Sequence, residues 1–198
     1  MLNSKIFVLV GFSGSGKSTL VRKLLRKDNK NIFYSVSVTT RPKRRGERDA
    51  KDYYFVSFTE FQKMIKRKEL LEWTFAYGNY YGTPKKPFMK ALKEGKKILM
   101  DLDIKGAQKI KKQFKEQSKV ILVLPPSFSV LKERLEKRKE KELNFRLAKD
   151  KKTWQEVLKS QRIFDYYLMN DNLKETIKNL EAIMRVEDLK EMPKLKRR

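Results

Sequence analysis

The sequence contains no cysteine and no histidine among its 198 residues. Disulfide bonds, thiol nucleophiles and imidazole bases are therefore excluded, and so are the side chains that most often bind zinc. Any chemistry must depend on Lys, Arg, Asp, Glu, Ser, Thr and Tyr. The lack of cysteine does not by itself identify a cellular compartment.

Long hydrophobic runs are also missing, since no apolar stretch approaches the roughly 20 residues that span a membrane. Residues 1–11, MLNSKIFVLVG, hold a short apolar run that leads straight into a glycine-rich motif. This arrangement is typical of a buried first strand and not of a signal peptide. We therefore expect a cytoplasmic protein with no membrane partner, built as one domain with small sub-domains.

Negative charge is scarce, because 49 Lys and Arg stand against 24 Asp and Glu, giving a net charge of +25. Such an excess attracts polyanions. The lysines are spread along almost every segment, however, which favours compositional bias over a dedicated binding surface. Charge of this kind indicates solubility and non-specific attraction, so we expect no specific nucleic-acid partner.

Short apolar segments alternate with segments of helical spacing. Continuous apolar runs predict buried strands at 5–10, 96–103 and 119–126. A last short strand is predicted at 164–170. Helices are predicted at 16–27, 84–94, from 104, over most of 127–163, and at 172–190. The alternation predicts an α/β fold whose parallel sheet is covered by helices on both faces.

The segment 35–83 breaks this rhythm. It predicts strands at 33–39 and 53–56 and a strand–turn–strand unit at 70–83. Between them, the capping box from Ser57 to Glu60 predicts a helix that runs through about residue 68. The segment therefore predicts a small mixed or antiparallel insertion carried on the core.

A phosphate-binding loop is predicted between the first strand and the first helix, where GFSGSGKS at 11–18 matches G-x-x-x-x-G-K-[ST]. Glycines let backbone N–H groups surround phosphate oxygens, and the helix N-terminus points at the same place. Lys17 suits the β- and γ-phosphates, and the Ser18 hydroxyl suits Mg²⁺. The residues predicted to bind ATP here are Gly11, Ser13, Gly14, Ser15, Gly16, Lys17, Ser18 and Thr19.

The loop alone does not separate a kinase from a GTPase or an ATPase motor. No guanine-reading N-K-x-D motif follows a strand, and 198 residues are few for a motor. A small kinase needs a second substrate pocket, and segment 35–83 has the size to form one.

Several further motifs make the chain similar to the guanylate kinases, which phosphorylate GMP with ATP. The motifs that carry the resemblance, in order, are GFSGSGKST, SVSVTTR, RRGERDAKDYYFVS, LLEWTFAYGNYYGTP, MDLDIKGA, LPPS and FDYYLMND. They extend from about Ile6 to Glu187. The resemblance implies a phosphate-loop core at 1–34, 84–126 and 164–190, a GMP-binding sub-domain at 35–83, a lid at 127–163 and a basic tail at 191–198.

The resemblance also implies roles for individual residues. The GMP phosphate is expected to bind Arg41, Arg44, Tyr53 and Tyr81, with Glu47 in the same GMP-binding group, and Asn170 is expected on the ATP side. The lid is expected to bring Arg134, Arg138 and Arg146 to the transferring phosphoryl group. Arg and Tyr suit phosphate oxygens through their forked or hydroxyl donors.

Base choice can be argued from the chemistry of guanine, which presents N1–H and N2–H₂ as donors and O6 as an acceptor. Glu72 can accept two parallel donors, and the hydroxyls of Ser37 and Thr83 can donate to O6. Asp103 can accept the remaining N2 hydrogen. Asp101, at the end of the same apolar strand, is a candidate for GMP or Mg²⁺ binding, because ligands meet parallel sheets at that edge.

The lid departs from the family pattern. A typical lid continues after its second arginine with Gly-Thr-acid, whereas here Arg138 is followed by Lys-Glu-Lys-Glu, and the connection to Arg146 is shorter. Loss of the glycine removes a flexible joint, and good helix formers replace it. We expect two more tightly joined helices that still deliver the arginines; the alternative is a degraded lid and a poor enzyme.

The expected reaction is transfer of the ATP γ-phosphoryl group to GMP, with dGMP as a second acceptor and Mg²⁺ as cofactor. The alternatives are a guanylate-kinase-like module that binds protein, and a kinase for another small phosphate such as a sugar phosphate. The retained phosphate loop argues against the first, and Glu72 with Ser37 and Thr83 against the second. Both a monomer and a homodimer are compatible with the sequence.

Overall fold

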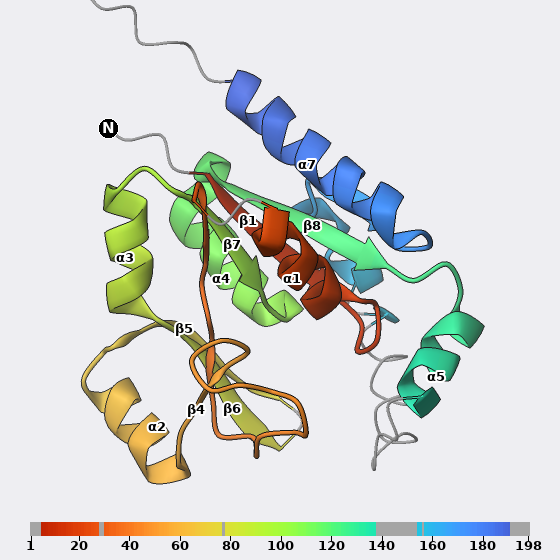
Figure 1. Ribbon diagram of the computed structural model, residues 1–198. Coiled ribbons are helices and arrows are strands. Elements are labelled where there is room, and N and C mark those ends of the chain that lie inside the picture. Colours follow the sequence, from red (N-terminus) through yellow and green to blue (C-terminus); the bar gives the residue numbers. More distant parts are fainter. Residues whose placement is uncertain (1–4, 28–29, 77, 138–153, 156, 191–198) are drawn as a thin grey trace, which may run out of the picture.

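The computed structural model describes residues 5–27, 30–76, 78–137, 154–155 and 157–190 (Figure 1). These residues form nine strands in two sheets, with helices around them. The strands are β1 (Ile6–Gly11), β2 (Ile32–Tyr34), β3 (Val38–Thr39), β4 (Tyr54–Phe55), β5 (Leu70–Ala76), β6 (Asn79–Pro84), β7 (Lys97–Asp101), β8 (Ser118–Leu124) and β9 (Tyr166–Met169). The α-helices are α1 (Lys17–Lys27), α2 (Phe58–Lys66), α3 (Lys85–Lys93), α4 (Ile104–Phe114), α5 (Phe128–Lys137) and α7 (Leu173–Leu189).

The larger sheet is parallel and has the order β2-β7-β1-β8-β9. Its central strand β1 is a run of apolar residues, and Val8 pairs with Met100 on one side and Val120 on the other. Side chains of β1 are buried on both faces, as expected where helices cover a parallel sheet on each side. The predicted α/β fold is therefore confirmed.

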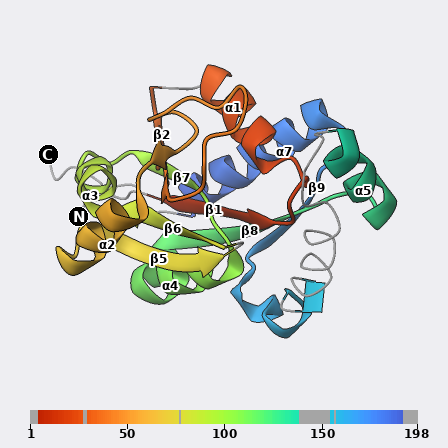
Figure 2. The same ribbon diagram turned by 90° about the horizontal axis from the view of Figure 1, so that it is seen from below.

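Helices lie on both faces of this sheet (Figure 2). On one face, α1 and α7 contribute Leu20, Leu24 and Leu180 to a buried cluster with Phe7 and Leu9 of β1. On the other face α3, α4 and α5 pack against the alternate residues of the same strands. The strands are thus held rigidly, and their carboxyl ends are presented at one edge.

The second sheet has the order β4-β3-β6-β5 and mixes a parallel β3–β4 pair with antiparallel β3–β6 and β5–β6 pairs. Sequence predicted a single strand over 33–39, and this prediction was wrong. β2 ends at Tyr34, which pairs with Leu99 of the large sheet, whereas Val38 of β3 pairs with Gly82 of the small one. The chain leaves one sheet and enters the other within four residues, which alternation alone cannot reveal.

The capping box is confirmed, because the Ser57 hydroxyl accepts a hydrogen bond from the Glu60 N–H at the start of α2. The predicted helix over 127–163 is described in part by α5, and residues 138–153 lie outside the described residues. No helix in the described ranges combines the length and the apolar character needed to cross a membrane. The division of the chain into core, sub-domain, lid and tail stays a prediction.

Candidate functional site

The phosphate loop joins the carboxyl end of β1 to the first turn of α1. Gly16 has φ +95°, a conformation that favours glycine, and a Cβ there would lie 2.1 Å from the amide nitrogen of Asn170. That nitrogen, Nδ2, donates a 2.7 Å hydrogen bond to the carbonyl of Ser15. Asn170 follows β9, so the far edge of the sheet holds the loop in shape.

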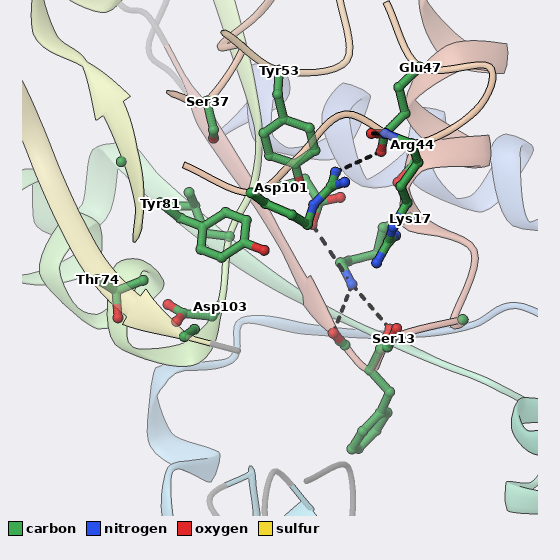
Figure 3. A pocket seen from close by; sticks show the side chains of 18 of the residues that line it. Ser13, Lys17, Ser37, Arg44, Glu47, Tyr53, Thr74, Tyr81, Asp101 and Asp103 are labelled. Carbon is green, nitrogen blue, oxygen red and sulfur yellow. Dashed lines mark hydrogen bonds and ion pairs between the residues drawn. The ribbon is translucent and has the colours of Figure 1, made fainter. Parts of the chain in front are cut away.

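Lys17 is directed into the loop (Figure 3). Its Nζ donates to the carbonyls of Gly11 and Phe12 at 2.7 and 3.2 Å and lies 3.8 Å from Oδ1 of Asp101. Burial raises the pKa of Asp101, and the Lys17 ammonium opposes that rise. The end of β7 therefore places a partly buried carboxyl group beside the Lys17 ammonium.

Arg134 of α5 reaches the same region from outside the sheet. Its Nη2 donates to the backbone carbonyl of Asn170 at 3.1 Å. Its Nη1 is buried and has no hydrogen-bond partner among the described residues. A buried donor without a partner is costly, so this nitrogen is suited to an anionic ligand. Arg138 and Arg146, predicted with it, lie outside the described residues.

The opposite end of the site is built on the small sheet. Glu72 of β5 is 6% exposed, and its Oε1 accepts a 2.7 Å hydrogen bond from the fully buried hydroxyl of Thr83 on β6. Burial raises the pKa of Glu72 to about 7; the Thr83 hydrogen bond and Lys109 lower it, and Asp103 raises it further. A carboxyl group so placed exchanges its proton near neutral pH and is poised to accept donors from a ligand.

Between these ends lies a cluster of anion-binding type. The Arg41 guanidinium is 2.7 Å from a carboxylate oxygen of Glu47 and 5.3 Å above the ring of Tyr53. Burial disfavours both charges, but the hydrogen bond between them and the attraction of neighbouring opposite charges together outweigh it, so the pKa of Arg41 is raised and that of Glu47 is lowered. The other Glu47 oxygen accepts the backbone N–H of Arg44. Glu47 thus orients the Arg41 side chain and the backbone at Arg44, and it is not itself suited to bind phosphate.

Two tyrosines complete the cluster. The rings of Tyr53 and Tyr81 meet edge to face at 6.1 Å. Burial, together with Asp101 and Tyr81, raises the pKa of Tyr53, so its hydroxyl stays protonated and can donate to an oxygen. Residues 41–53, Tyr81 and Asp101, which are distant in the sequence, therefore converge on one point.

One cavity of about 210 Å³ connects the two ends. Most of the residues predicted from the sequence line it, namely Gly11, Ser13, Gly14, Gly16, Lys17, Ser18, Ser37, Arg41, Arg44, Glu47, Tyr53, Glu72, Tyr81, Asp101 and Asp103. The predicted residues outside that lining are Ser15, Thr19, Thr83, Arg134 and Asn170. Thr83 and Asn170 act behind the lining, through Glu72 and Ser15.

Sequence reasoning missed some lining residues. Thr74 and Ala76 follow Glu72 on the same face of β5 and also line the cavity. Since alternate residues of a strand share a face, the strand period would have identified them. Gly106 was also missed: a Cβ there would lie 3.1 Å from Oε2 of Glu72, so the first turn of α4 passes close beneath that carboxyl group. No local sequence pattern indicates such an approach between distant segments.

Comparison with known proteins agrees with this arrangement. A profile described as guanylate kinase matches residues 3–187. The chain is 43% identical over 190 residues to a guanylate kinase of Carboxydothermus hydrogenoformans, covering 96% of this chain and 92% of the relative. It is 36% identical over 190 residues to one of Thermotoga maritima, covering 96% and 90%.

A solved structure supports the same assignment. The crystal structure of guanylate kinase from Anaplasma phagocytophilum matches with a TM-score of 0.77 and 33% identity, over 94% of this chain and 87% of that one. The sequence resemblance is thereby confirmed over nearly the whole length. The chain belongs to the guanylate kinase family.

Proposed function

We propose that this protein transfers the γ-phosphoryl group of ATP to GMP, releasing ADP and GDP, and that it also accepts dGMP. The observation that carries the proposal is the single cavity whose lining includes Lys17 of the phosphate loop at one end and the buried carboxyl group of Glu72 at the other. A donor site and a purine-monophosphate site joined in this way suit direct transfer between two nucleotides. We also propose a cytoplasmic location.

We assign ATP to the phosphate loop. Backbone N–H groups of the loop and the N-terminus of α1 favour its phosphates. Lys17 would exchange its bonds to the carbonyls of Gly11 and Phe12 for bonds to phosphate oxygens. Asn170 supports the loop through Ser15, and Arg134 offers the same anion its Nη1, for which the described part of the chain supplies no hydrogen-bond partner.

We assign the GMP phosphate to Arg41, Arg44, Tyr53 and Tyr81. The fork of Arg41 is already oriented by Glu47, so little side-chain freedom would be lost on binding. The base extends toward Glu72, with Ser37 near O6 and Asp103 near N2. The sequence-based role of Thr83 as an O6 donor is replaced, because its one hydroxyl proton is given to Glu72 from behind the cavity lining. Adenine would place an unprotonated N1 against Glu72, a mismatch that well-built sites reject by about 10⁴.

Mg²⁺ is the proposed cofactor, and the residues present suit it. No cluster of three acidic side chains occurs in the described ranges, but a Mg²⁺–nucleotide site needs only one or two protein ligands besides phosphates and water. Ser18 and Asp101, which line the same cavity, would hold it. When bound, the ion neutralises charge on the phosphates.

The chemistry asks mainly for alignment and neutralisation, so the absence of histidine is no obstacle. An oxygen of the GMP phosphate attacks the γ-phosphorus, and the bond to the ADP oxygen breaks. Because the attacking oxygen of the GMP phosphate is already ionised at neutral pH, no general base is needed. Lys17 and the arginines offset the charge that spreads over the transferring oxygens.

The test is an ADP-release assay with ATP and each of GMP, dGMP, AMP, UMP and CMP. We expect rapid release with GMP and kcat/KM values for AMP, UMP and CMP lower by about 10³ or more. Equal turnover with AMP would contradict the proposal that the site selects guanine. No turnover with any nucleotide, together with retained GMP binding, would favour the protein-binding module.

A further inference from the structure

The two carboxyl groups assigned to guanine come from different parts of the fold. Asp103 caps α4 in the core, where its Oδ1 accepts the Gly106 N–H at 2.7 Å. Glu72 belongs to β5, which among the described strands pairs with β6 alone and so forms an edge of the small sheet. Their mutual placement therefore depends on whatever holds β5 against α4.

Helix α4 contacts β5 at two points on one face. Gly106 passes under the Glu72 carboxyl group, where an added Cβ would lie 3.1 Å from Oε2. Three residues later, and so on the same side of the helix, Lys109 donates a hydrogen bond from Nζ to the backbone carbonyl of Trp73. Its ammonium also lies 5.6 Å from the centre of the Trp73 ring.

We propose that Lys109 is a positioning residue for base recognition: by bonding to the backbone of Trp73, it fixes the neighbouring Glu72 at the distance from Asp103 that guanine requires. It touches no reacting atom and acts through the strand. The inference rests on the proposed GMP kinase function and adds an exposed residue that does not line the cavity.

The positive charge of Lys109 also supports base recognition by Glu72. The groups facing Glu72 are the Thr83 hydroxyl on β6, Asp103 at the start of α4, and Lys109 on α4. Lys109 supplies the positive charge among these groups, and it opposes the effect of Asp103 by favouring the ionised form of Glu72. Because Lys109 is solvent-exposed, this contribution weakens as salt rises.

Three variants separate a specific role of Lys109 from a general effect of positive charge on α4. Lys109→Gln removes the charge and the ammonium donor, Lys109→Arg keeps a cation with N–H donors, and Lys112→Gln removes an equal charge from an exposed position of the same helix. Lys112 is not among the groups that shift the pKa of Glu72. Each is assayed with GMP and with IMP, whose base lacks the 2-amino group that both carboxyl groups are assigned to accept.

For Lys109→Gln we expect KM for GMP to rise about threefold to tenfold, as for loss of one hydrogen bond, with kcat and KM for ATP unchanged. The preference for GMP over IMP should fall, and the acid limb of kcat/KM for GMP should move to higher pH, by less at 0.5 M salt than at low salt. Lys109→Arg should restore all three, and Lys112→Gln should match the wild type.

Wild-type values of KM, GMP preference and acid limb in Lys109→Gln would overturn the inference while leaving the kinase function intact. So would equal effects of Lys112→Gln, which would indicate general charge, or a parallel loss of ATP affinity, which would indicate damage to the fold. A wild-type enzyme inactive on GMP would instead overturn the proposed function itself.

Discussion

The hydroxyl of Thr83 donates a 2.7 Å hydrogen bond to Oε1 of Glu72, and both side chains are buried between the small sheet and the core. The two residues are on neighbouring strands and pair directly across β5 and β6. This bond both orients the carboxyl group and favours its ionised form. It gives the first prediction.

Thr83→Val removes the hydroxyl and keeps the shape of the side chain. We expect kcat/KM for GMP to fall by about tenfold, since a buried bond to a charged group is lost, while KM for ATP stays unchanged. Steady-state kinetics with each substrate varied would measure this. Thr59→Val, at an exposed position of α2, is the control, and an equal loss in both variants would contradict a special role for Thr83.

The pH dependence follows from Glu72, whose pKa is raised to about 7. Guanine supplies only donors to this group, so GMP binds the ionised form, and kcat/KM for GMP should fall as pH drops below about 7. Calorimetry in buffers of different ionisation enthalpy should detect a proton released on GMP binding at pH 6.5. In Glu72→Gln this acid limb should disappear, together with most of the activity on GMP; a limb that persists would belong to another group.

In the nucleotide-free protein, the contribution of Glu72 to folding stability should decrease as pH rises, whereas kcat/KM for GMP should increase. The folded pKa of Glu72 lies above its unfolded value, so its contribution is fully present below about pH 4.5 and is lost as pH rises through about 7. Glu72→Gln, which carries no charge, should therefore be more stable than the wild type at pH 8, by about 1–3 kcal/mol. Urea unfolding at pH 5 and pH 8 would measure the difference. A less stable variant at pH 8 would show that the ionised carboxylate is well compensated in the folded state.

Lys17→Ala should lower kcat by several orders of magnitude, because Lys17 provides the cation within the phosphate loop. The expected measurement is ADP release at saturating ATP and GMP, with circular dichroism to confirm folding. Lys23→Ala, on an exposed position of α1, should have wild-type activity. Near-normal turnover in Lys17→Ala would contradict the assignment of ATP to the phosphate loop.

The arginines expected in the lid give the last prediction. Arg138→Ala and Arg146→Ala should reduce kcat strongly and leave GMP binding, measured by calorimetry without ATP, almost unchanged. Arg134→Ala, whose guanidinium bonds to the Asn170 carbonyl, should in addition weaken ATP binding. Loss of GMP affinity would place Arg138 or Arg146 in the acceptor site, and normal kinetics would mean that the altered lid does not reach the phosphates.

Local patterns in the sequence determined much of this protein. The apolar run of β1, the spacing of the phosphate loop and the capping box of α2 are contained within short stretches of chain, and each appears where it was predicted. The candidate residues also followed from chemistry, since guanine and phosphate each demand particular donors and acceptors. Most of those residues line one cavity.

Only the tertiary structure decided how these pieces meet. The split of 33–39 between two sheets depends on partners at Leu99 and Gly82, far along the chain. The raised pKa of Glu72 depends on burial, and the approach of Gly106 and Lys109 to β5 depends on the packing of a core helix against an edge strand. Such effects arise from contacts between distant segments, because burial and mutual distance are properties of the packed chain and not of any local stretch of it.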